Sequence, residues 1–183
     1  MKSLKLFIST IIITSGIVSA AKPSPLPRGC GELNVIYTGL PGTHRLVGVQ
    51  GWDKVYVDRE IKKAHKEMIN AGYNVKSVLL GPEQDIRILA KEMDDTPWDI
   101  TGIGFGLRGS IIGEIISRFE DIIMLYRNKA PDAPTVFNYN PESFLWSIQR
   151  RAPLSSDCAG SPGKDLGYEE ICQGECQNGK DEL

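Results

Sequence analysis

Short apolar stretches alternate with amphipathic stretches four times between residues 33 and 152. The apolar stretches have the length of strands, and they lie at 33–37, 74–80, 98–105 and 134–139. The stretches between them place apolar residues every three or four positions, which is typical of helices with one buried face. This alternation indicates an α/β fold in which helices cover both faces of a parallel sheet. We expect four to five strands in a Rossmann-like or flavodoxin-like sheet with strand order 2-1-3-4.

Residues 41–57 interrupt this pattern because they carry no clear period. They form either a long loop or a loop with a short edge strand at 54–57. Asp58 then fits as the N-cap of a helix that Gly72 ends. His65 lies in a lysine-rich part of this helix, so its side chain is expected to face solvent.

Residues 153–183 hold glycine, proline, serine, acidic residues and three of the four cysteines, with no period. We therefore expect an irregular C-terminal tail that disulfides pin to the α/β domain at 33–152. Three pairings are open among Cys30, Cys158, Cys172 and Cys176. Any full pairing joins the N-terminal segment to the tail, and closing so long a loop stabilises a fold by about 3–5 kcal/mol. The spacing of the last two cysteines has one residue more than a Cys-x-x-Cys motif, which argues against a thioredoxin-like activity.

The two ends of the chain resemble cellular addresses. Residues 1–20 combine two lysines, an apolar run and small residues before Ala20, which is typical of a cleaved secretory signal peptide. A proline-rich lead-in follows at 21–32. The chain ends in the retrieval tetrapeptide of the endoplasmic reticulum, Lys180, Asp181, Glu182 and Leu183. Together these features predict a protein of the endoplasmic reticulum lumen whose partner is the KDEL receptor.

Composition excludes several function classes. Lysine and arginine number 21 and aspartate and glutamate 23, so the formal net charge is -2, which argues against nucleic-acid binding. No segment after the signal peptide is apolar and long enough for a transmembrane segment. His44 and His65 lie far from the cysteines in sequence, so we expect no metal site, and no motif indicates a cofactor.

Several stretches carry a resemblance to a known family. They are WDITGIGFGLR at 98–108, Phe119–Glu120, Ala130–Pro131, FNYNPE at 137–142 and QRR at 149–151. Through them, residues 71–153 resemble a family of small α/β proteins of uncharacterised function from bacteria and fungi. The resemblance implies a Rossmann-like fold and no established activity. The signal peptide, the cysteine-containing tail and the retrieval tetrapeptide depart from this family.

Open parallel sheets bind ligands beyond the carboxyl ends of their strands, where the strand order reverses. With order 2-1-3-4 this point lies between the first and third strands, and the fourth strand ends beside it. The candidate ligand-binding residues there are Thr38, Gly39, Gly106, Arg108, Ser110 and Asn138.

Arg108 lies within a glycine-rich run at 104–109 that spells Gly-x-Gly-x-x-Gly. In dinucleotide-binding proteins this motif follows the first strand, whereas here it follows the third. We therefore expect the glycines to let the strand end approach its neighbours and to let the chain turn sharply. An arginine beside free backbone N–H groups favours a phosphate or a carboxylate. The alternatives are a surface arginine or a structural ion pair of Arg108 with Glu83 or Glu142.

His44, in the loop after the first strand, is the candidate acid/base residue, although no acidic residue is placed by spacing to orient it. Three functions stay open. The protein binds a small anion or a partner at the strand-end crevice without catalysis. Alternatively, it is a small enzyme acting on an anionic metabolite, with Arg108 as clamp and His44 or Asn138 in the chemistry. The third alternative is a secretory-pathway accessory without a ligand site.

Overall fold

The computed structural model describes residues 28–176. The predicted signal peptide, most of the proline-rich lead-in and the retrieval tetrapeptide lie outside the described residues. Within the described part of the chain, no helix combines the length and hydrophobicity needed to cross a membrane.

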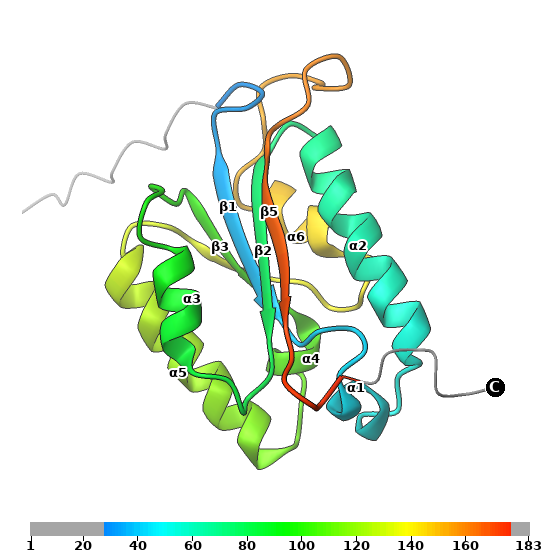
Figure 1. Ribbon diagram of the computed structural model, residues 1–183. Coiled ribbons are helices and arrows are strands. Elements are labelled where there is room, and N and C mark those ends of the chain that lie inside the picture. The colour runs from blue at the N-terminus through cyan, green and yellow to red at the C-terminus, as the bar shows by residue number, and fades with distance from the viewer. Residues whose placement is uncertain (1–27, 177–183) are drawn as a thin grey trace, which may run out of the picture.

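Five strands form one parallel sheet with order β4-β3-β1-β2-β5 (Figure 1). This order contains the predicted 2-1-3-4 arrangement and adds a fifth strand at the edge beside β2. The strands are β1 (Asn34–Gly39), β2 (Asn74–Leu80), β3 (Ile100–Ile103), β4 (Thr135–Phe137) and β5 (Asp165–Ile171).

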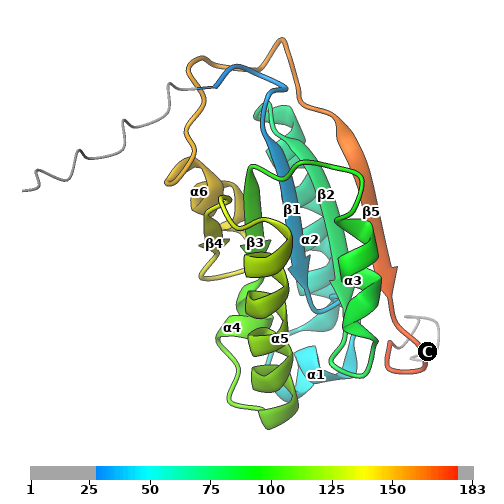
Figure 2. The ribbon, with the colours of Figure 1, turned by 90° about the vertical axis from the view of Figure 1, so that its left-hand side faces the viewer.

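Helices cover both faces of the sheet, as predicted. In Figures 1 and 2, α2 and α6 lie on one face, and α3 and α5 lie on the other. The short helices α1 and α4 lie at the carboxyl ends of the strands, at the bottom of Figure 1. The helix bounds are α1 (Arg45–Val49), α2 (Lys54–Asn70), α3 (Ile86–Glu92), α4 (Phe105–Arg108), α5 (Gly113–Lys129) and α6 (Phe144–Gln149).

The core lies where the central strands meet the two helical layers. Val35, Ile36 and Tyr37 of β1 are fully or almost fully buried although they point to alternate faces. A strand covered on both faces has no polar side, which explains why its sequence is a continuous apolar run. The core therefore fixes β1 at the centre of the sheet and places its carboxyl end between those of β2 and β3.

Residues 41–57 differ from the expectation, because they hold α1 and the start of α2 rather than a long loop or an edge strand. The N-cap of α2 is Asp53 and not Asp58, and the Asp53 carboxylate accepts a hydrogen bond from the Tyr56 N–H at 2.6 Å. The expected solvent exposure of His65 is also wrong. Its ring is buried by β5, with Ser77 and Asp165 within hydrogen-bond distance at 2.8 and 3.2 Å.

The C-terminal tail is more regular than predicted. Its residues 165–171 form β5, which pairs in parallel with β2 and covers His65 with Tyr168. The strand is half-exposed, Gly167 has a φ of +129°, and the register with β2 shifts at Val75 and Lys76. These irregularities remove the alternation of apolar and polar residues by which a strand is usually predicted.

The Cys30–Cys158 disulfide joins the N-terminal segment to the start of the C-terminal tail at the amino end of the sheet. It joins residues 128 positions apart. This agrees with the prediction that any full pairing links the N-terminal segment to the tail. Cys158 is buried against Gly72, which follows α2 with a φ of +99°. The tail is thus fixed beside the amino ends of β1 and β2.

Candidate functional site

A pocket opens at the carboxyl ends of β1 and β3, the place where the strand order reverses. Its cavity volume is about 50 Å³. One water molecule needs about 10–15 Å³ of such space, so a few water-sized groups fit. The lining residues are Gly39, Leu40, Val47, Gln50, Trp52, Val57, Ile61, Leu79, Gly104, Phe105, Gly106, Asn138, Pro141 and Phe144.

The pocket wall is almost entirely apolar. Side chains from α1, α2, α4 and the start of α6 converge on the two strand ends. The polar side-chain groups of the lining are the amides of Gln50 and Asn138 and the indole N–H of Trp52. Small cavities with apolar walls stay dry and accept apolar groups. The crevice that the sequence places here therefore has the lining of a site for a small apolar group.

Close approach of two glycines shapes the floor of this pocket. A Cβ atom on Gly104 would lie 3.4 Å from the Gly39 Cα and from the Thr38 carbonyl oxygen. The Gly104 N–H donates to that carbonyl at 2.8 Å, which binds the end of β3 to the end of β1. The glycines thus let the ends of β1 and β3 approach closely, as we expected, and they let the chain turn directly into α4.

Asn138 holds the other wall in place. Its Oδ1 accepts a hydrogen bond from the Phe105 N–H at 2.8 Å, and its Nδ2 donates to the Asn140 carbonyl at 2.8 Å. The side chain is almost fully buried, so these bonds replace the water it loses. Asn138 therefore connects the end of β4 to the first residue of α4 and orients Phe105 towards the pocket.

Arg108 ends α4 at the rim of the pocket. Its guanidinium lies 5.2 Å from the centre of the Phe105 ring, and Nη2 donates to the Asn138 carbonyl at 3.3 Å. Neither expected carboxylate partner is there, since Glu83 lies beside His44 and Glu142 accepts from the Tyr56 hydroxyl. Across residues 28–176, no acidic side chain lies within ion-pair distance of Arg108. The rim thus presents an exposed guanidinium without a carboxylate.

Three of the six predicted ligand-binding residues line the pocket, namely Gly39, Gly106 and Asn138, and Arg108 lies at its rim. Thr38 is turned away, because its hydroxyl donates to the Val78 carbonyl at 2.7 Å. The Ser110 hydroxyl accepts from the Ile112 N–H at 3.1 Å, before the start of α5. Neither is among the lining residues, and both have local structural roles.

His44 is fully buried and caps α1. The Leu46 N–H donates to its Nδ1 at 3.2 Å, so Nδ1 carries no proton and Nε2 does. Nε2 faces the Glu83 carboxylate at 3.2 Å. An acid therefore does orient His44, contrary to the expectation from spacing. Both ring nitrogens already have partners, which leaves none free to take a proton from a substrate.

The Glu83 carboxylate belongs to the loop after β2, which Arg118 fixes by donating to the Pro82 carbonyl at 2.8 Å and to the Gln84 carbonyl. Burial acts to raise the pKa of Glu83. Hydrogen bonds from Gln84, from its own backbone N–H and from His44 outweigh that effect, so the pKa lies below its ordinary value. Glu83 is therefore a carboxylate near neutral pH.

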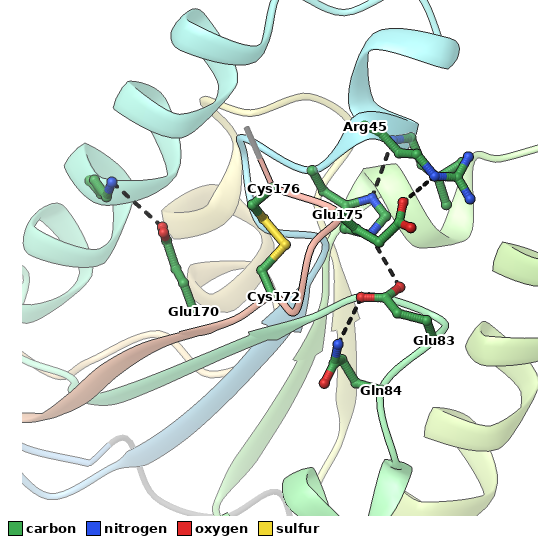
Figure 3. The surroundings of a disulfide bond; sticks show 10 residues. Arg45, Glu83, Gln84, Glu170, Cys172, Glu175 and Cys176 are labelled. Atoms are coloured by element: carbon green, nitrogen blue, oxygen red, sulfur yellow. Dashed lines mark hydrogen bonds and ion pairs between the residues drawn. A yellow bond between two sulfur atoms is a disulfide. The ribbon is translucent and has the colours of Figure 1, made fainter. Parts of the chain in front are cut away.

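Cys172 completes a cluster with His44 and Glu83, whose potential ligand atoms lie within 4.8 Å of one another. Figure 3 shows the Cys172–Cys176 disulfide with Glu83, Arg45 and Glu175 beside it. The sulfur of Cys172 is bonded to Cys176, and Nε2 of His44 carries a proton. In this state two of the three groups lack the free lone pair or negative charge that binds a metal ion.

Comparison with protein-family models, with curated proteins and with solved structures found no match to this chain. The resemblance of residues 71–153 to small α/β proteins of bacteria and fungi stays a prediction.

The residues that sequence reasoning missed are the apolar ones. Trp52, Phe105 and Phe144 form much of the pocket wall, yet apolar residues at helical spacing also build a core. No local signal separates the two roles, because the cavity arises only where α1, α2 and α4 meet. Glu83 was missed as the partner of His44 because the two lie on different loops, 39 residues apart.

Proposed function

We propose that this protein binds a small molecule with a short apolar group and one anionic group in the crevice between β1 and β3. The observation that carries this proposal is the pairing of an apolar cavity with an arginine at its rim that has no carboxylate partner among residues 28–176. The apolar group would fill the cavity beside Trp52 and Phe144. The anionic group would then face Arg108.

The size of the cavity favours small ligands. A cavity of about 50 Å³ suits a chain of a few carbon atoms. A carboxylate is a suitable anionic group, since a guanidinium binds it through two parallel hydrogen bonds. Short-chain carboxylic acids are thus the ligand class we propose.

Binding is preferred over catalysis because of the surroundings of the titratable groups. Both ring nitrogens of His44 have partners, and burial raises the pKa of Tyr37 above its ordinary value against opposing hydrogen bonds and the charge of Arg108. The Tyr37 phenol therefore keeps its proton near neutral pH, and His44 has no ring nitrogen without a partner.

We further propose that this binding takes place in the endoplasmic reticulum lumen. The predicted signal peptide and the final tetrapeptide support this location, although both lie outside the described residues. The two disulfides are compatible with an oxidising compartment. Deleting Lys180 to Leu183 should release the intact protein to the medium, as immunoblotting of cells and medium would measure. Undiminished retention without these residues would contradict retrieval by the KDEL receptor.

The binding proposal is tested by calorimetric titration of the oxidised protein with straight-chain carboxylates of two to eight carbons. We expect saturable binding that is tightest at three to five carbons. Arg108→Gln should weaken it about tenfold or more, since it removes a charge-assisted contact. Arg127→Gln, an exposed substitution on α5, is the matched control and should bind as the natural protein does. No saturable binding of any carboxylate, or equal binding by the Arg108 variant, would contradict the proposal.

A further inference from the structure

The chain after β5 closes into a small ring at the carboxyl end of the sheet. Cys172 and Cys176 are four positions apart, and both are half-buried rather than buried. The turn between them carries Gly174 with a φ of +77°. In the other disulfide, Cys158 is 3% exposed and only Cys30 is half-buried, so one of its two sulfur atoms belongs to a buried residue. A disulfide that solvent reaches is open to attack by a thiol, whereas a buried one is shielded.

We propose that Cys172–Cys176 is a redox-exchangeable disulfide that reacts reversibly with thiols of low molecular weight. The spacing differs from Cys-x-x-Cys, so the inference rests on the surroundings of the bond and not on a motif. Three features support it: partial exposure of both cysteine residues, attachment of the ring by contacts other than the disulfide, and two polar groups beside Cys172.

The ring stays attached when the disulfide opens. β5 is paired to β2 over its length, and the Arg45 N–H donates to the Glu175 carbonyl at 2.9 Å. The Arg45 guanidinium also forms an ion pair with the Glu175 carboxylate (Figure 3). An isolated bridge pairs His44 with Cys176. Because these contacts do not involve the sulfur atoms, the two thiols would stay close together, and the bond could form again without refolding.

His44 and Glu83 give the sulfur of Cys172 a partner in both protonation states. The sulfur lies within 4.8 Å of a ring nitrogen of His44 and of a carboxylate oxygen of Glu83, so an imidazole and a carboxylate are its neighbours. The Leu46 N–H occupies Nδ1, which keeps the proton on Nε2. A Cys172 thiolate would share with Glu83 the hydrogen bond from Nε2–H, and a Cys172 thiol would donate to Glu83.

The reaction proceeds in two exchange steps. A substrate thiolate attacks the Cys176 sulfur, a mixed disulfide forms, and the bond to Cys172 breaks with Cys172 leaving as a thiolate stabilised by His44. A second substrate thiolate attacks the substrate sulfur of the mixed disulfide and releases Cys176. Two substrate thiols are thereby oxidised to one disulfide, the protein disulfide gains two electrons, and the two thiol protons end on Cys172 and Cys176.

The test incubates the oxidised, folded protein in glutathione buffers of increasing ratio of thiol to disulfide. Free thiols are alkylated and located by mass spectrometry, while circular dichroism reports the fold. We expect Cys172 and Cys176 to be reduced and reoxidised together with an unchanged spectrum, while Cys30–Cys158 stays oxidised. If Cys172–Cys176 is reduced only when the protein unfolds, the proposal is wrong.

Substitution of His44 tests the chemical part of the proposal. His44→Asn keeps an acceptor for the Leu46 N–H and removes the donor beside Cys172, so the rate of reduction by glutathione should fall about tenfold. His65→Asn, at the other buried histidine, should leave the rate unchanged. Glu83→Gln provides a second variant and should speed reduction, because the negative charge next to the leaving thiolate is removed. Folded His44 and Glu83 variants that both react at the natural rate would overturn the proposal.

Discussion

The Cys30–Cys158 and Cys172–Cys176 disulfides lie at opposite ends of one sheet, and they differ in loop length and in the groups around them. At the amino end, Cys158 is buried against Gly72 and its bond spans 128 residues. At the carboxyl end, the second bond spans four residues beside the strand-end crevice and the His44–Glu83 pair. The comparison teaches that loop length and burial, rather than the bond itself, decide whether a disulfide holds a fold together or is free to react.

Removing each disulfide in turn should give the largest expected difference in unfolding free energy between the two ends of the sheet. In the chain-entropy model a loop of 128 residues contributes about 5 kcal/mol and a loop of four residues about 2 kcal/mol. We expect the Cys30→Ser, Cys158→Ser double variant to lose about 5 kcal/mol of unfolding free energy, and the Cys172→Ser, Cys176→Ser double variant about 2 kcal/mol or less. Urea unfolding measures both. Equal losses would remove the distinction drawn between the two ends.

Replacing Gly72 or Gly106 with alanine compares how tightly the two ends of the sheet are packed. A Cβ atom on Gly72 would lie 2.5 Å from the Cys158 sulfur and 2.9 Å from Leu154 Cδ1, on a backbone with positive φ. Gly72→Ala should therefore cost about 2–4 kcal/mol. At Gly106 the new Cβ meets only Leu40 Cδ1, at 3.8 Å.

The unfolding free energy of Gly106→Ala should thus stay within about 1 kcal/mol of that of the natural protein. The change should be towards greater stability, because alanine has a higher helix propensity than glycine. Its methyl group should still weaken carboxylate binding, since Gly106 lines the pocket. Thermal unfolding and calorimetric titration of the two variants would measure these effects. A severe loss of stability in the Gly106 variant would show that the crevice end is packed as tightly as the amino end.

The smallest expected effect is on the pH dependence of stability, and it comes from Glu83 at the carboxyl end of the sheet. Hydrogen bonds that outweigh burial hold the pKa of Glu83 below its ordinary value, so the folded state binds its proton less readily than the unfolded state. The resulting stability is present at neutral pH and is lost as pH falls below the ordinary glutamate range, near pH 4. Glu83→Gln should therefore lose less stability between pH 6 and pH 3 than the natural protein, as urea unfolding would show. Glu120→Gln, on the exposed face of α5, is the control, and an identical loss in both variants would contradict this role of Glu83.

The sheet order was predictable because each buried parallel strand needs a helical crossover, and the four crossovers leave apolar signals in the sequence. β5 was not predictable from those signals, because it is half-exposed, contains Gly167 at positive φ and follows a bulged register. His65 was placed in solvent for the same reason, since the strand that buries it was not foreseen.

The position of the candidate site was predictable from the sequence, but the apolar nature of its lining was not. The reversal of strand order placed Gly39, Gly106 and Asn138 together, and these three do line the crevice. Its apolar wall was not foreseen, because Trp52 and Phe105 meet only through the packing of helices distant in sequence. Sequence reasoning finds polar residues at strand ends more readily than cavities between apolar ones.

The central claim, that the carboxyl end of the sheet takes a small carboxylate while the amino end holds the fold, is tested most directly by nuclear magnetic resonance. Butanoate would be titrated into ¹⁵N-labelled oxidised protein, with the backbone amides of the glycines as probes at both ends. We predict saturable shifts at Gly39, Gly104 and Gly106, and unchanged signals at Gly31 and Gly72. Shifts confined to Gly31 and Gly72, or no saturable shift at the crevice glycines, would contradict the account.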